Sequence, residues 1–265
     1  MLSFTITLNF NVVNQTIYRQ RDVTKDMKPL KFICLIAACI GLTAPLIARA
    51  GTLASGFNTS VWNDPGTLPW GSHTDHGSEY YQPWDAEFGN GYLTLHSIYN
   101  VNGHRYESGT AWGKVLVPSG GYSWLSIDVD IYNPNAGVRG CWPAWWLDSA
   151  WNWPPEIDIA EFKGSNGGNV WQNAVGSDGV WSVVQSNINK SQWHHYGLAL
   201  GPASGGRRTY QLFLDGNIRN QGSIPDVQGV PFWVIANYAM EGDSYSPGPN
   251  YNTYVQYHNY VLATH

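Results

Sequence analysis

The chain has 265 residues, of which 12% are charged, and a formal net charge of −5. One domain of the β-sandwich or barrel type, together with a removable leader, fits this length. Residues 1–50 hold six of the 14 Lys and Arg residues but only two of the 19 Asp and Glu residues, so the rest of the chain is strongly acidic. An acidic surface argues against nucleic acid, anionic membranes and highly sulfated polymers as partners.

The first 50 residues contain the pattern of a signal peptide. Two lysines precede an apolar run at 32–40, and Ala48-Arg49-Ala50 has the small-x-small pattern of a cleavage site. We expect a signal peptide at 27–50, a mature chain that begins at Gly51, and a secreted or periplasmic protein. The apolar run is too short for a membrane span, which needs roughly 20 apolar residues. We interpret residues 1–26 as a mis-annotated upstream extension.

From residue 51 onward, short apolar segments alternate with turns rich in Gly and Pro. Apolar and polar side chains alternate over 125–132, which is typical of a strand with one face in the core. Asp215-Gly216 follows a similar run and is a strong hairpin signal. Further strands are expected at 92–98, 170–175, 180–184, 210–214 and 232–238. We therefore predict an all-β sandwich or jelly roll, with 51–265 as one domain.

Tryptophan is the unusual component of the composition. All 14 Trp residues lie after residue 50. Most of these rings must be buried, because aromatic side chains dominate the buried area of proteins. A domain of this size rarely needs so many in its core, and flat apolar rings also stack against sugar rings. Composition alone favours core and sugar-binding groove about equally for the remainder.

Three carboxylates stand within the apolar run Glu156-Ile-Asp-Ile-Ala-Glu161. Strand alternation places Glu156 and Asp158 on one face and the two isoleucines on the other. Glu161 follows Asp158 by three residues, so a regular strand would turn it to the wrong face. We predict a one-residue β-bulge near 159–160, which returns Glu161 to the carboxylate face.

Carboxyl groups that share a face suit the hydrolysis of a glycosidic bond. In retaining glycosidases the two are about 5–5.5 Å apart, and one attacks the anomeric carbon while the other protonates the leaving oxygen. A third acid between them helps to keep a proton in the site through like-charge repulsion. The alternative is a solvent-facing strand without function. Acids are depleted in strands, however, and three on one face repel one another.

Two segments resemble glycoside hydrolase family 16. Trp153-Pro-Pro-Glu-Ile-Asp-Ile-Ala-Glu161 looks like the active-site strand of that family, and Gly140-Cys-Trp-Pro-Ala-Trp-Trp-Leu147 resembles the strand that precedes it. The resemblance implies a concanavalin-like β-jelly-roll with a concave substrate groove. It also implies retaining endo-hydrolysis, with Glu156 as nucleophile, Glu161 as acid/base and Asp158 as the assisting carboxylate. The bulged E-x-D-x-x-E spacing is similar to that of the laminarinase-like, β-1,3-glucanase branch.

The same resemblance suggests which residues contact the substrate. Trp142 and Trp146 are four residues apart and share a face, which makes them candidates for stacking on sugar rings, with Trp145 turned to the core. In the following strand we expect Trp171 and Asn173 to face the groove.

Two positions depart from the family's pattern. Thr110 stands where many relatives have an arginine after a Ser-Gly pair, which puts one substrate contact in question. Asn252 begins the stretch where relatives often have an Asp linked to a structural calcium. The histidines also lack the paired spacing of a zinc site. We expect no metal in the site and no cofactor, and a structural calcium stays an open question.

The sequence thus predicts a monomeric endo-glycosidase that acts on β-1,3-glucan or mixed β-1,3/1,4-glucan, with a polysaccharide as its partner. Two alternatives stay open. One is an enzyme of the same family that cleaves galactan or transfers glycosyl units. The other is a non-catalytic, lectin-like jelly roll, which the three acids disfavour because a pure binder has no need for all of them.

Overall fold

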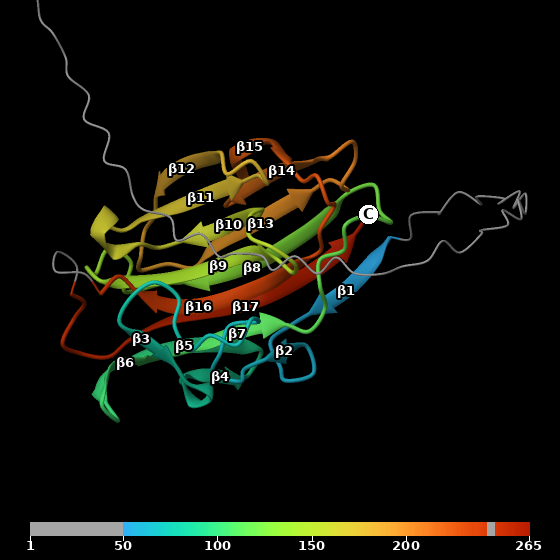
Figure 1. Cartoon of the computed structure of the whole chain (residues 1–265). Helices are drawn as coiled ribbons and strands as arrows, with labels where there is room; N and C mark the ends of the chain where they lie inside the picture. Colours follow the sequence, from blue (N-terminus) through green and yellow to red (C-terminus); the bar gives the residue numbers. More distant parts are fainter. Residues whose placement is uncertain (1–49, 243–246) are drawn as a thin grey trace, which may run out of the picture. The chain divides into compact units, whose positions relative to one another are not determined.

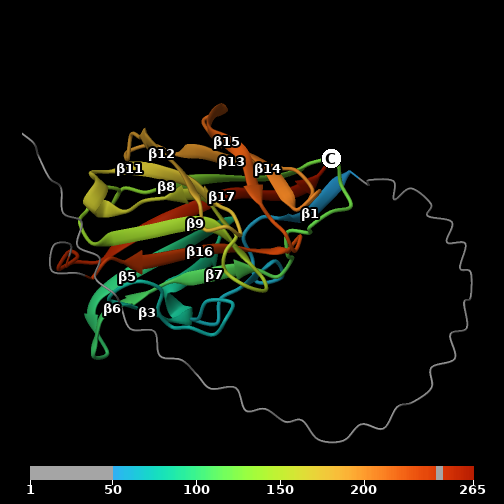
Figure 2. The same ribbon diagram turned by 45° about the horizontal axis from the view of Figure 1, so that its top comes forward.

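The computed structural model describes residues 50–242 and 247–265. Strands make up most of this part of the chain and form two sheets (Figures 1 and 2). The helical segments described are the short 3₁₀ turns η1 (Pro83–Asp85) and η2 (Gly164–Asn166). No helix in the described ranges is long and apolar enough to cross a membrane. The predicted leader and upstream extension lie outside these ranges, apart from Ala50.

The larger sheet has ten strands in the order β15-β14-β13-β8-β17-β5-β6-β3, with β1 paired to β17 and β4 paired to β5. All of its pairings are antiparallel except that of β3 with β6. Its strands are β1 (Gly51–Ser55), β3 (Glu79–Tyr81), β4 (Ala86–Gly89), β5 (Tyr92–Val101), β6 (His104–Ser108), β8 (Leu125–Tyr132), β13 (His194–Leu200), β14 (Arg207–Leu214), β15 (Asn217–Pro225) and β17 (Thr253–Thr264).

The smaller sheet has seven strands in the order β12-β11-β10-β9-β16-β7-β2. Every pairing in it is antiparallel. Its strands are β2 (Trp62–Asn63), β7 (Thr110–Gly113), β9 (Cys141–Ser149), β10 (Glu156–Glu161), β11 (Asn169–Val175), β12 (Trp181–Asn187) and β16 (Phe232–Met240). Strand β10, which carries the three acids, is therefore an interior strand with a hydrogen-bonded neighbour on each side.

The predicted all-β sandwich is confirmed, and each strand expected from the sequence is present within a few residues of its predicted ends. Strand β8 alternates buried and half-buried residues along its whole length, as its period-two pattern indicates. Asp215 and Gly216 have φ values of 50° and 74° and join β14 to β15, which is the left-handed turn that an Asp-Gly pair favours.

The core lies between the two sheets. Ile157 and Ile159 of β10 point into it, opposite the carboxylates of the same strand. Trp145 of β9 is fully buried there, and its ring contacts an aromatic cluster made of Phe57, Trp62, Tyr257 and Tyr260. The prediction that Trp145 belongs to the core is confirmed. Large apolar side chains thus anchor β9 and β10 on the face toward the core, and the opposite face can carry polar side chains.

Replacing Trp145 with alanine should remove a large part of this anchor. We expect Trp145→Ala to lower the free energy of unfolding by about 3–5 kcal/mol, the usual cost of deleting a buried aromatic ring. Trp151→Ala is the matched control, because Trp151 is 59% exposed, and it should change that free energy by less than about 0.5 kcal/mol. Urea unfolding followed by fluorescence would measure both. Equal losses in the two variants would contradict this account of the core.

Candidate active site

The predicted β-bulge in β10 is present. Asp158 pairs with Trp146 of β9 and Ala160 pairs with Trp145, so two residues of β10 advance against one of β9. The register with β11 shifts in the same place, between Asp158 and Glu161. Because of the extra residue, Glu161 lies on the same face as Asp158, away from the core.

A cleft of about 790 Å³ lies over this face of the smaller sheet. It contains every residue predicted for the site: Glu156, Asp158, Glu161, Trp142, Trp146, Trp171 and Asn173. These residues come from β9, β10 and β11, which are neighbours in the sheet. The structure therefore brings the predicted set together in one place.

Each of the two glutamates accepts a hydrogen bond from an indole N–H group. Trp142 Nε1 donates to Glu161 Oε1 at 2.7 Å, and Trp153 Nε1 donates to Glu156 Oε2 at 2.5 Å. Asn173 links Asp158 to Glu161, since its Nδ2 donates to Asp158 Oδ2 at 3.0 Å and to Glu161 Oε2 at 2.8 Å. These donors fix the orientation of all three acids.

Burial raises the pKa of Glu156 to about 8, although hydrogen bonds from Trp153 and Asp158 favour its ionised form. Burial also raises the pKa of Asp158 well above its usual range, and the negative charges of Glu156 and Glu161 add to this effect. The bond between Glu156 and Asp158 lowers the pKa of the first and raises that of the second. A proton on Asp158 therefore favours the ionised form of Glu156, although burial keeps the pKa of Glu156 high.

Glu161 differs from its neighbours because two basic side chains lie near it. Burial raises its pKa, while the Trp142 hydrogen bond and the charge of Lys163 act in the opposite direction, together with Asn173 and His76. The three acids therefore sit in different environments although they share one strand. Such differences are how one site provides both a base and an acid.

A loop before β3 forms one wall of the cleft, and its anchor is the buried carboxylate of Glu79. This carboxylate accepts backbone N–H groups of Asp75, His76 and Gly77 at 2.6, 3.1 and 3.2 Å, and that of Met240 in β16 at 2.9 Å. A Cβ at position 77 would lie 1.7 Å from the Met240 carbonyl oxygen, so only glycine fits. The loop is thereby held against the smaller sheet.

Sequence reasoning missed several residues of the cleft. Asp75 and His76 line it, but they stand in a loop with no pattern, some 80 residues before the acids. Asn237 of β16 lines it as well, accepting from Trp146 Nε1 and donating to Asp75 Oδ2. The available signal was the alternation of β16, which places Asn237 opposite the core-facing Ala236.

Further tryptophans form the rim of the cleft. Trp146 lines it as predicted but is only 7% exposed, because the loop before β3 covers it. The free ring surface belongs to others: Trp70 (51% exposed), Trp151 (59%), Trp153 (58%) and Trp181 (44%). The groove therefore takes a large share of the Trp residues, which composition could not decide.

The two departures from the family's pattern have other roles in this fold. The Thr110 hydroxyl is buried and donates to the Ala236 carbonyl at 3.2 Å, so it does not face the cleft. The Asn252 side-chain oxygen accepts the Tyr99 N–H at 3.0 Å. Within 50–242 and 247–265, no three His, Cys, Asp or Glu side chains are grouped as metal ligands. The absence of a cofactor stays a prediction.

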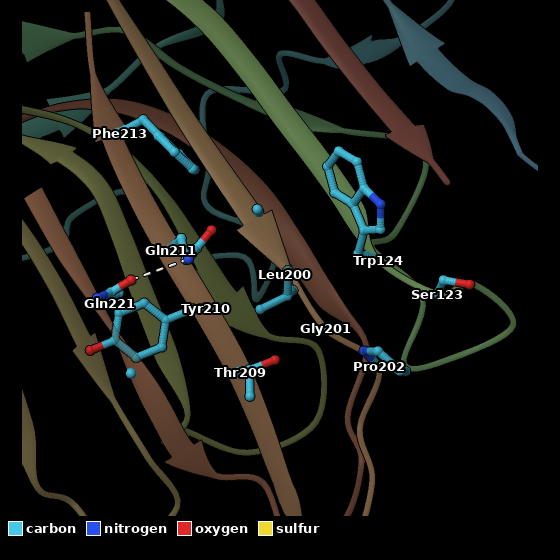
Figure 3. A pocket seen from close by; sticks show the side chains of 12 residues that line it. Ser123, Trp124, Leu200, Gly201, Pro202, Thr209, Tyr210, Gln211, Phe213 and Gln221 are labelled. Atoms are coloured by element: carbon cyan, nitrogen blue, oxygen red, sulfur yellow. Dashed lines mark hydrogen bonds between the residues drawn. The ribbon is translucent and has the colours of Figure 1, made fainter. Parts of the chain in front are cut away.

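A second cleft, of about 770 Å³, lies on the larger sheet over β13, β14 and β15 (Figure 3). Trp124 and Phe213 line it, as do Gln211 and Gln221, whose side-chain amides are hydrogen-bonded between β14 and β15 at 3.1 Å. Its lining has no carboxyl, imidazole, amine or thiol group. We therefore place the candidate active site in the first cleft, where carboxylates converge.

The raised pKa of Glu156 predicts a pH-dependent stability. Between its usual value of 4.5 and about 8, the folded protein keeps a proton that the unfolded chain releases, so the free energy of unfolding falls as the pH rises through this range. Glu156→Gln removes this contribution, and we expect it to be about 1–3 kcal/mol more stable than the parent at pH 8. Urea unfolding over pH 5–9 would measure the difference.

The matched control is Glu87→Gln, because Glu87 is an exposed acid of β4 outside the cleft. Its unfolding free energy should follow that of the parent at every pH. Identical pH dependence in the parent and in Glu156→Gln would contradict the environment described for Glu156.

Comparison with known proteins finds relatives of part of the sequence and solved structures with a similar fold. No family model matches the chain. It is 29% identical over 155 residues, 56% of its length, to a galactan endo-β-1,3-galactanase of Flammulina velutipes, and 24% identical over 154 residues to the endo-1,3-1,4-β-glycanase ExsH of Rhizobium meliloti. These matches span 59% and 30% of the two relatives. The fold matches a crystal structure of a family GH16 endo-β-1,3(4)-glucanase with a TM-score of 0.60, at 15% identity, over 82% of this chain and 96% of the other.

Proposed function

We propose that this protein is an endo-acting, retaining glycoside hydrolase of family 16 that cleaves a neutral β-linked polysaccharide. The observation that carries the proposal is the arrangement of Glu156, Asp158 and Glu161, which share one face of a bulged strand beneath a Trp-lined cleft. The curated relatives support it, since both are named as endo-acting enzymes on β-linked polysaccharides.

In the proposed first step, the Glu156 carboxylate attacks the anomeric carbon. The glycosidic C–O bond breaks, and Glu161 gives its proton to the leaving oxygen. In the second step Glu161 takes a proton from water, whose oxygen attacks the anomeric carbon and releases Glu156. We propose that Asp158, whose pKa burial raises, stays protonated and so favours the ionised form of Glu156.

The charges of the cleft select the class of substrate. Its described lining contains the acids Asp75, Asp148, Glu156, Asp158 and Glu161, but neither Lys nor Arg. Sulfate or carboxylate groups on a glycan would meet carboxyl groups there and find neither Lys nor Arg in the lining to pair with. Exposed indole rings offer flat apolar surface to uncharged sugars. A neutral glycan therefore fits this cleft.

We propose β-1,3-glucan or mixed β-1,3/1,4-glucan as the substrate. The 24% identical relative is named for 1,3-1,4-β-glycan cleavage, and the matched crystal structure is that of a β-1,3(4)-glucanase. A β-1,3-galactan is the second candidate, because the relative with 29% identity is named as an endo-β-1,3-galactanase. Both candidates share the β-1,3 linkage and the same chemistry.

Activity on a panel of glycans would test the proposal. We expect the parent to release reducing ends from laminarin, lichenan or β-1,3-galactan, and Glu156→Gln to lose activity by more than about 10³-fold, because no nucleophile is left. Glu161→Gln should lose about 10²–10⁴-fold, the range of general acid–base catalysis. Proton NMR of the first products should show the β-anomer, as retention requires.

Glu87→Gln is again the control and should keep the parent's activity. A parent that binds these glycans without cleaving any would favour the lectin-like alternative. A first product in the α-configuration would exclude the double displacement. Longer products formed at high substrate concentration would indicate glycosyl transfer by the same site.

We also propose that the mature protein is exported, that residues 27–50 are its leader, and that 51–265 are its catalytic domain. The support is the cleavage pattern at Ala48-Arg49-Ala50 and the start of strand β1 at Gly51. Expression in a secreting bacterial host followed by intact-mass measurement should give a chain that begins at Gly51. Retention of residues 1–26 in the exported protein would contradict this assignment.

A further inference from the structure

Trp142 has more contacts than a free sugar-stacking platform would have. Its N–H group donates to Glu161 Oε1 at 2.7 Å. The Lys163 ammonium lies 3.8 Å from the centroid of its ring, and the imidazole of His76 is stacked on it at 4.5 Å with an interplanar angle of 14°. One indole thus joins two basic side chains to one carboxylate.

The members of this group come from separate parts of the fold. Trp142 is on β9, Lys163 follows the end of β10 by two residues, and His76 is on the loop before β3. Glu79 holds that loop in place through the backbone N–H of His76 at 3.1 Å. Lys163 is half-buried, and its backbone precedes the 3₁₀ turn η2. The group therefore joins a strand, the segment that follows β10 and a loop that Glu79 anchors.

We propose that Lys163 and His76 are positioning residues that act through Trp142 to orient and tune Glu161 as the acid/base of the reaction. This inference rests on the proposed function, in which Glu161 must give up a proton and then take one back. Nothing in that mechanism requires a cation close to Glu161. The stack formed by His76, Trp142 and Lys163 supplies two basic side chains. The hydrogen bonds described for Glu156 and Asp158 involve neither of them.

The charges around Glu161 give the stack its role. Burial opposes the ionisation of Glu161. The charge of Glu161 in turn raises the pKa of Glu156 and of Asp158 on the same strand. Asp75 Oδ1 is 3.5 Å from His76 Nε2. Lys163 and His76 are the two basic side chains that act to lower the pKa of Glu161. A Glu161 carboxyl held too firmly in its protonated form would be a poor base in the second step.

Lys163→Met tests the inference, because it keeps the length of the side chain and removes its charge. We expect the basic limb of the kcat/KM profile to move to higher pH, since Glu161 keeps its proton longer without the ammonium. At neutral pH kcat should fall roughly threefold to tenfold. KM should stay nearly constant, because Lys163 is not among the residues that line the cleft. Lys163→Arg should restore the parent's profile.

A double-mutant cycle tests whether Lys163 works through the indole. Trp142→Phe removes the N–H donor, so adding Lys163→Met to it should have much less effect than Lys163→Met alone. His76→Gln removes the ring that is stacked on Trp142 and should lower kcat as Lys163→Met does. The matched control is Lys190→Met, since Lys190 is exposed and lies outside the cleft.

Carbon-13 NMR titration of the Glu161 carboxyl provides a readout without turnover, and its midpoint should rise in Lys163→Met but not in Lys190→Met. An active parent whose pH profile and Glu161 titration are unchanged in Lys163→Met would overturn this inference and leave the proposed function intact. A parent that cleaves no glycan would overturn both. Additive effects in the double-mutant cycle would overturn the role of Trp142.

Discussion

The cleft depends on one extra residue in β10. A strand carries side chains alternately on its two faces, so residues three apart point in opposite directions. The bulge after Asp158 changes this parity once, and Glu161 thereby joins Glu156 and Asp158 above the sheet, while Ile157 and Ile159 stay in the core. A regular β10 would bury Glu161 among apolar side chains. The bulge is therefore the constraint from which the geometry of the site follows.

Three acids on one face are costly to hold, and the surrounding residues reflect that cost. Trp142, Trp153 and Asn173 donate hydrogen bonds to the carboxylates, and the side chains below them form a dense aromatic core. Burial nevertheless raises the pKa of Glu156 and Asp158. The buried acids that suit the chemistry thus lower the stability of the fold. Strands β9 and β11, which pair with β10 on either side, hold the acids in position.

The parts of the site that could be predicted are those that depend on residues close together in the sequence. Local periodicity predicts the strands, the bulge and the face that carries the carboxylates. The neighbours of β10 on β9 and β11 could also be inferred, because strands that follow one another in the sequence usually pair. Asp75, His76 and Asn237 could not, since a loop and a distant strand bring them there by tertiary packing alone. Strand alternation also places Trp142 and Trp146 on the same face, so the same role is predicted for both. The loop before β3 covers the second, while the first contacts His76 and Lys163.

The carboxylate of Glu79 has a further consequence for recognition. It accepts N–H groups from the loop before β3 and from Met240 at the end of β16, so one side chain links the wall of the cleft to its floor. Gly77 allows the two backbones to come into direct contact. The distance between wall and floor beside Glu161 is thus set by the protein's own hydrogen bonds before a ligand arrives. A glycan that enters there meets a gap whose width is already set, and thicker chains are excluded. A glycan that fits binds without the entropy loss of ordering the loop.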